Sequence, residues 1–125
     1  MTYQERFSTY FQRPVAVQAT RSLSNSCGIE FRIAAGETHA EEVFHFTRQG
    51  GANRVVAGAS PHPEIVFSML PSAAEELLGD SSEDVGTVGI NVIRQILSPE
   101  PAKKISISLK EIGRASCRER VCSTV

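Results

Sequence analysis

The chain of 125 residues contains no tryptophan, only three cysteines and little excess charge, with 13 basic and 14 acidic residues. An odd number of cysteines does not form a disulfide framework, and a near-neutral charge argues against a nucleic-acid binder, which would carry a basic stripe. No apolar run approaches the ~20 residues of a membrane-spanning helix. The opening sequence, MTYQE, lacks the basic and apolar regions of a secretory signal. These absences predict a cytoplasmic protein without a nucleic-acid partner.

Motifs that carry chemistry are also missing. The sequence has neither a Gly-x-Ser-x-Gly turn for a nucleophilic serine nor a Gly-Lys-Ser/Thr phosphate loop. Its three histidines, His39, His45 and His62, match no zinc-ligand spacing with Cys27. The GTVG run at 86–89 is similar to a loop that clamps nucleic-acid backbones, but acidic rather than basic residues precede it. We therefore predict no enzymatic activity, no metal and no cofactor.

The end of the chain differs from the rest, because its arginines are crowded and no apolar period continues into it. Residues 112–121 can be read as the codons ATC GGA AGA GCG TCG TGT AGG GAA AGA GTG, which resemble a common short-read sequencing adaptor. We predict a truncated domain over 1–111 and a non-native tail over 112–125, which is left out of fold reasoning. Without the tail's three arginines and one glutamate, 10 basic and 13 acidic residues remain, with one free thiol, typical of a reducing compartment.

Apolar periodicity predicts helices and strands in a definite order. A helix is expected over 2–12, where aromatic residues recur at helical spacing, whereas 15–19 fits either a strand or an extension of that helix. Alternating apolar residues predict strands at 29–33, 42–48, 54–57, 64–70 and 104–110. Gly50 and Gly51 are typical of a hairpin turn.

Two further helices are expected between the last two strands. The first begins at a capping box, Ser72 to Glu75. The second runs from Val85 to about Leu97 and presents an apolar stripe, with Arg94 and Gln95 facing away. Its internal glycines each cost up to about 1 kcal/mol relative to alanine, so close packing on the sheet or on a ligand is expected to offset them.

This order predicts an α+β domain: a helix, four antiparallel strands, two helices and a closing strand form a five-stranded, mainly antiparallel sheet with helices on one face. Ile105, Ile107 and Leu109 are expected to face the helices. The sheet face is rich in aromatic residues and has two interpretations. It is either the filled core of a structural or protein-interaction module, or a partly hollow core that holds a lipid.

Several of these runs resemble the sterol-binding domain of the type-two sterol carrier protein family. The resemblance rests on Gly28–Ile33, on Glu42–Thr47, and on Pro63–Met69 leading directly into Ser72–Leu78, and it extends to Lys110. It implies a five-stranded sheet, helices on one face and a lipid tunnel between them. The implied ligands are sterols, fatty acyl chains or phospholipids, with no enzymatic activity. The chain departs from the family over 98–104, where a glycine-rich stretch is usual.

The resemblance and the apolar pattern together place an apolar lipid between the helix 85–97 and the sheet, with transient membrane contact as a further expectation. The sequence indicates no oligomeric state. The candidate ligand-contacting residues are Phe31, Phe44, Phe46, Phe67, Met69, Leu77, Val88, Val92, Ile96 and Ile107.

Overall fold

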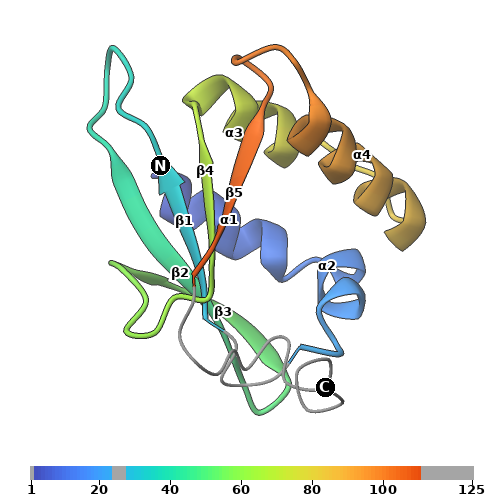
Figure 1. Cartoon of the computed structure of the whole chain (residues 1–125). Coiled ribbons are helices and arrows are strands. Elements are labelled where there is room, and N and C mark those ends of the chain that lie inside the picture. Colours follow the sequence, from blue (N-terminus) through green and yellow to red (C-terminus); the bar gives the residue numbers. More distant parts are fainter. Residues whose placement is uncertain (1, 24–27, 111–125) are drawn as a thin grey trace.

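The computed structural model describes residues 2–23 and 28–110 (Figure 1). The predicted tail over 112–125 and Cys27 lie outside these residues. In chain order the elements are α1 (Tyr3–Phe11), α2 (Pro14–Ala19), β1 (Ile29–Ile33), β2 (Glu42–Gln49), β3 (Ala52–Ala57), β4 (Ile65–Met69), α3 (Pro71–Leu78), α4 (Val85–Leu97) and β5 (Ile105–Leu109). The prediction of an α+β fold with a five-stranded sheet is confirmed, and Figure 1 shows the helices over one face of that sheet.

The strand order β3-β2-β1-β4-β5 brings the first and fourth strands together. Three neighbouring pairs are antiparallel, but β1 and β4 are parallel, with Phe31 opposite Phe67. The expectation that the first four strands are all antiparallel is therefore wrong. The chain leaves β3 and crosses the sheet before it enters β4, and the alternation within each strand carries no information about such a crossing.

The crossing segment, residues 58–64, covers the sheet face opposite the helices. The backbone N–H of Ser60 donates to the Glu30 carboxylate at 3.0 Å, and Arg32 donates to the same carboxylate at 2.7 Å. A Cβ at Gly28 would lie 2.1 Å from the carbonyl oxygen of His62, so only glycine fits there. Glu30 is almost fully buried as a result, whereas Arg32, on the same face of β1, stays exposed.

Proline determines where α2 begins, and two glycines form the turn between β2 and β3. The segment that fitted either strand or helix is the helix α2, because Pro14 occupies its first position, where a missing N–H costs nothing. Gly50 and Gly51 have φ values of +58° and +81° and form the two-residue turn between β2 and β3. Positive φ at both turn positions matches the twist of a hairpin, so the predicted turn is confirmed.

The aromatic residues of α1 pack into the sheet. Phe7 is fully buried, and its ring centroid lies 5.3 Å from that of Phe31 and 5.2 Å from that of Phe44. Tyr3 and Tyr10, one turn before and one after, are buried as well. This arrangement confirms the helical spacing predicted for these residues and places the densest part of the core over β1 and β2.

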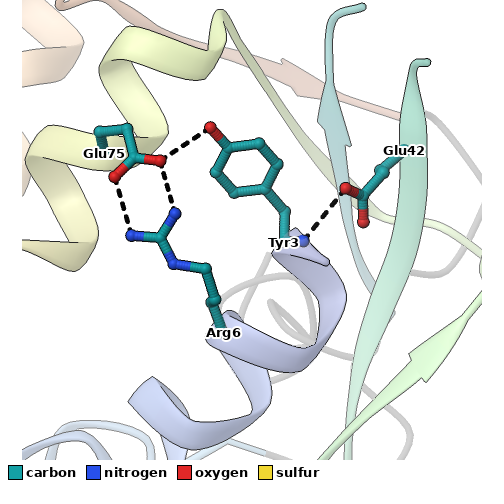
Figure 2. A network of polar contacts seen from close by, with 4 residues as sticks. All are labelled: Tyr3, Arg6, Glu42 and Glu75. Atoms are coloured by element: carbon teal, nitrogen blue, oxygen red, sulfur yellow. Dashed lines mark hydrogen bonds and ion pairs between the residues drawn. The ribbon is translucent and has the colours of Figure 1, made fainter. Parts of the chain in front are cut away.

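Two carboxylates fix the N-terminal end of α1 (Figure 2). Glu42 of β2 accepts the backbone N–H groups of Tyr3 at 3.0 Å and Gln4 at 3.1 Å, which have no partner within the helix. Glu75 of α3 accepts both terminal nitrogens of Arg6 and, at 2.9 Å, the Tyr3 hydroxyl. Hydrogen bonds from Arg6 and then Tyr3 lower the pKa of Glu75 to about 2. These contacts tie α1 to both the sheet and α3.

The start of α4 follows the prediction, whereas that of α3 does not. Asp84 caps α4 by accepting the backbone N–H of Thr87 at 2.9 Å. In contrast, α3 begins at Pro71 and has no side-chain cap. The Ser72 hydroxyl donates instead to the carbonyl oxygen of Ala102 at 2.6 Å, so the predicted capping box is not formed.

The closing strand β5 lies in the predicted orientation but is only partly covered. Ile105 and Ile107 pair with Met69 and Phe67 of β4, so they share the helix-facing side of the sheet. Ile105 is 2% exposed, but Ile107 is 42% and Leu109 59% exposed. The expectation that all three are buried is wrong, because β5 is the edge strand and the described helices cover only its first residue.

We predict that Ile105→Ala lowers the free energy of unfolding by about 2–5 kcal/mol, as expected for a buried isoleucine. Ile107→Ala, on the same strand and face, should cost less than about 1 kcal/mol because the side chain is already half in water. Urea titrations of both variants measure the difference. Equal losses would contradict the partial cover of β5.

We predict that Glu75 contributes a pH-dependent part of stability. Its pKa in the folded protein, about 2, is below the ordinary value of 4.5, so its contribution is complete above about pH 4.5 and is lost as the pH falls towards 2. The half-exposed ion pair limits this to about 1 kcal/mol. Urea titrations over this pH range measure the effect. Glu75→Gln should reduce the fall in unfolding free energy as the pH is lowered. Glu76→Gln, at an exposed neighbour, should leave that fall unchanged.

Candidate functional site

An apolar cavity of about 400 Å³ lies between the sheet and the helices α1, α2 and α4. Its walls are apolar or aromatic side chains and one glycine, with Thr20 as the exception. The lining residues are Tyr10, Phe11, Ala16, Ala19, Thr20, Ile29, Phe31, Phe46, Phe67, Met69, Leu77, Val85, Val88, Gly89, Val92, Ile93 and Ile105. The cavity has the volume and lining of a small-molecule site.

The structure brings most of the predicted ligand-contacting residues into this lining. The seven that line the cavity are Phe31, Phe46, Phe67, Met69, Leu77, Val88 and Val92. Three do not. Phe44 is fully buried in the core against Phe7, Ile96 packs against the core beside the cavity, and Ile107 is 42% exposed at the sheet edge. The structure therefore places these three predicted residues outside the cavity lining.

The wall formed by α1 and α2 was not predicted. Tyr10 and Phe11 end the aromatic stripe of α1, whose spacing in the sequence served only to predict a helix. Ala16, Ala19 and Thr20 come from the segment whose conformation was ambiguous. The proline at the start of α2 was the available signal, since it favours a first helical turn. Nothing in the sequence placed α2 opposite α4.

Hydrogen bonds from its middle and from near its end hold α4 in place. In the middle of α4, the Asn91 amide donates to the Asp80 carboxylate at 3.1 Å. Near its end, the Gln95 amide donates to the carbonyl oxygens of Ala73 at 3.0 Å and Lys103 at 3.1 Å. Gln95 is therefore buried, and the expectation that it faces away from the core is wrong. A buried amide needs such partners, and here they join α4 to α3 and to the loop before β5.

The loop before α4 is fixed to the first helices. The Arg13 guanidinium donates to the carbonyl oxygens of Asp80 at 2.8 Å and Ser82 at 2.6 Å. Burial alone would raise the pKa of Asp80, but hydrogen bonds from Ser82 and Asn91 outweigh it and hold the pKa below its ordinary value. The ionised carboxylate is thus stabilised where α4 begins.

The glycines of α4 do not mark close packing on the sheet. A Cβ built at Gly89 would have no heavy atom of the described residues within 4 Å, apart from the neighbouring helix backbone. At Gly86 the nearest such atom is a carboxylate oxygen of Asp84, at 3.2 Å. Of the two expected alternatives, close packing on the sheet is therefore wrong, whereas packing on a ligand stays a prediction, since Gly89 borders the cavity.

A group of hydrogen-bonded polar residues forms one end of the cavity. The Asn53 amide donates to the Thr20 hydroxyl at 3.0 Å and to the carbonyl oxygen of Phe11 at 2.8 Å. The Arg48 guanidinium donates to the carbonyl oxygen of Thr20 at 2.6 Å. Thr20 and Phe11 line the cavity, whereas Asn53 and Arg48 are buried directly behind them. We call Thr20, Arg48 and Asn53 the polar end.

A second hollow, of about 420 Å³, has a different lining. It includes Arg32, Glu41 and Lys104 together with Ser68 and Ser106, which point away from the helices. Mixed charges and hydroxyl groups already exposed to water give no reason for an apolar molecule to enter. The apolar cavity is therefore the stronger candidate site.

Within the described residues, no helix is long and apolar enough to cross a membrane, and no three histidine, cysteine or acidic side chains are grouped to hold a metal ion. Comparison of the chain with protein-family models, curated proteins and solved structures finds no match. The candidate site is therefore argued from its geometry and from the sequence resemblance.

We predict that Gly89→Ala raises the free energy of unfolding of the ligand-free protein by about 0.5–1 kcal/mol. Alanine is the better helix former by about this amount, and its methyl group would enter open space. A urea titration measures the change. A destabilised variant would show that the space beside Gly89 is already filled.

Proposed function

We propose that the chain binds an apolar lipid in the cavity between its helices and its sheet, without catalysing a reaction. The observation that carries this proposal is the apolar lining, in which Thr20 is the only non-aromatic polar side chain among the described residues. Water in such a cavity finds few hydrogen-bond partners, whereas an apolar chain gains about 25 cal/mol for each Å² removed from water. A lipid is the class of ligand that such a lining favours.

The resemblance to the type-two sterol carrier family supports the same function. The fold that it implies, a five-stranded sheet with helices on one face, is the fold of this chain. Its implied ligands, sterols, fatty acyl chains and phospholipids, all carry the apolar body that the cavity favours. A cytoplasmic location and the absence of catalysis are part of this proposal.

Exposed apolar residues on α4 support a transient contact with a membrane surface. Ile90 and Ile93 are exposed, and Leu97 is 74% exposed, although all three lie on the helix that borders the cavity. A lipid would pass between a membrane and the cavity beside these residues. The alternative function, a protein-interaction module with a filled core, would use the same exposed residues but does not require the cavity.

We predict that Nile red, a neutral apolar dye, binds the purified protein saturably and that Val92→Trp weakens this binding at least about tenfold. Val92 lines the cavity, and an indole there would occupy the space of the ligand. Val56→Trp is the matched control, because Val56 is exposed on β3 and lines no part of the cavity. Fluorescence titration measures affinity, and circular dichroism checks that both variants are folded.

A filled core gives the opposite results. Wild type would then bind no Nile red saturably, and Val92→Trp would be overpacked and destabilised by about 1–3 kcal/mol. Either result would favour the protein-interaction module. Mass spectrometry of lipid extracted from the purified protein provides a second, independent measurement.

A further inference from the structure

The strand β5 forms one edge of the sheet, with β4 as its strand neighbour among the described residues (Figure 1). The backbone N–H of Lys110 donates to the carbonyl oxygen of Glu64 at 2.8 Å, on the β4 side. Because the direction of the backbone groups alternates along a strand, the even-numbered residues of β5 pair with β4. The N–H and C=O groups of Ile105, Ile107 and Leu109 therefore point away from the sheet, with no strand partner in the described part of the chain.

The opposite edge of the sheet, formed by β3, is protected. The helix α1 packs against β3, and the Gln4 side chain donates to the carbonyl oxygen of Val55 at 3.3 Å. The same strand carries the exposed cation Arg54. Covering elements and charged residues are the usual means of protecting an edge strand. In contrast, β5 contains neither a charge nor a proline, and its last four residues are exposed.

The exposed part of β5 is apolar on one face and polar on the other. Ile107 is 42% and Leu109 59% exposed, both on the helix-facing side, whereas Ser106 and Ser108 alternate with them on the opposite side. A further strand beside β5 would continue both faces, since side chains alternate in the same way along every strand of a sheet. Apolar side chains at its alternate positions would cover the two exposed residues.

Lysines flank this strand at both ends. Lys103 and Lys104 precede β5, Lys110 follows it, and all three are exposed. The Lys104 ammonium donates to the carbonyl oxygen of Ile96 at 2.7 Å. The ion pairs within the described residues involve none of these lysines. The free edge is therefore uncharged in its middle and positive at both ends.

This charge pattern distinguishes between two occupants of the edge. In an antiparallel pair of two copies, all the outward-pointing groups of β5 pair only when Ile107 lies opposite itself. That register places Lys104 opposite Lys110 twice, and like charges directly opposite each other are destabilising. A strand with acidic residues at both ends would place opposite charges at the same positions. The charges therefore favour an acidic partner strand over a second copy.

We propose that the free edge of β5 binds an extended segment of a partner protein, in which alternating apolar residues lie between acidic ends. The backbone groups of Ile105, Ile107 and Leu109 supply the hydrogen bonds of strand addition, and the flanking lysines supply the charge preference. The proposal does not require a ligand in the cavity. The alternative is that the lysines only keep two copies of the chain apart, in which case no such segment binds.

The first test uses the whole protein and the fluorescein-labelled peptide DEVTVTVED, followed by fluorescence anisotropy. We expect saturable binding with a Kd of about 100 µM or lower, and at least about tenfold weaker binding of KKVTVTVKK. N-methylation of the valine amides should abolish binding, because these N–H groups would face β5. N-methylation of the threonine amides, which would face away from β5, is the matched control and should preserve binding.

Variants of the protein test the same contacts from the other side. Ile107→Pro should weaken binding of DEVTVTVED at least about tenfold, because it removes an N–H that points away from β4 and so leaves the existing ladder intact. Ile107→Thr, which keeps the N–H, should bind nearly as wild type does. Lys110→Glu should weaken DEVTVTVED and strengthen KKVTVTVKK, whereas Arg54→Glu on β3 should change neither. Circular dichroism checks that each variant is folded.

The outcomes are decisive without any variant of the protein. If DEVTVTVED does not bind wild type saturably, or if the lysine-ended peptide binds equally well, the proposal is wrong. Concentration-dependent dimerisation in analytical ultracentrifugation that Ile107→Pro abolishes would identify a second copy as the occupant and would also overturn it. The Nile red titration is independent of these measurements, so the lipid-binding proposal stands or fails separately.

Discussion

The helix α4 is held by polar contacts at its start, at its middle and near its end, in addition to the packing of its apolar residues on the core, and the cavity beside it depends on this constraint. Asp84 caps its first turn, Asn91 reaches the Asp80 carboxylate, and the buried Gln95 joins it to α3 and to the loop before β5. Between these points Val88 is buried and Val92 packs against the core, and both also line the cavity. A helix fixed in this way keeps its position although the interface beneath it is not completely filled.

The same sheet face carries both the aromatic packing of α1 and the cavity, and the two meet at β1 and β2. Phe31 lies at the boundary, with its ring 5.3 Å from Phe7 of α1 on one side and 5.3 Å from Phe67 of β4 on the other. Over β1 and β2, α1 brings aromatic rings into direct contact with the strands. The cavity extends from Phe46 of β2 to Ile105 of β5, and Val88 and Val92 of α4 line it from the helix side. Densely packed interiors contain few such voids, so the cavity is a specific property of this fold.

The sequence predicted features that depend on local periodicity. Alternation identified β1 and β5, helical spacing identified the buried face of α1, and Gly50 with Gly51 identified the hairpin. It did not predict the parallel pairing of β1 with β4, because that pairing depends on where the chain crosses the sheet. It assigned Gln95 to the surface, because an amide is buried only where carbonyl oxygens from other elements reach it.

The candidate site was predictable to a similar extent and for the same reason. Strand patterns identified the residues of β1, β2 and β4 that face the helices, and the helix pattern identified those of α4 that face the sheet. Most of these residues line the cavity. Ile107 has the correct pattern, but it is exposed because cover depends on the arrangement of helices over an edge strand. The polar end could not be inferred, because Thr20 is far in the chain from Arg48 and Asn53, which face each other across the β2–β3 hairpin, and meets them only through the position of α2.

In a small domain, an apolar cavity links the stability of the fold to whether a ligand fills the cavity. The walls of an empty cavity lose the packing contacts that a filled core would make. A ligand that binds only the folded state stabilises it by mass action, by about 2.7 kcal/mol at a hundred times its Kd. The polar contacts of α4 and the aromatic packing of α1 on the sheet would then maintain the fold while the cavity is empty, and the ligand would supply the contacts missing from the cavity walls.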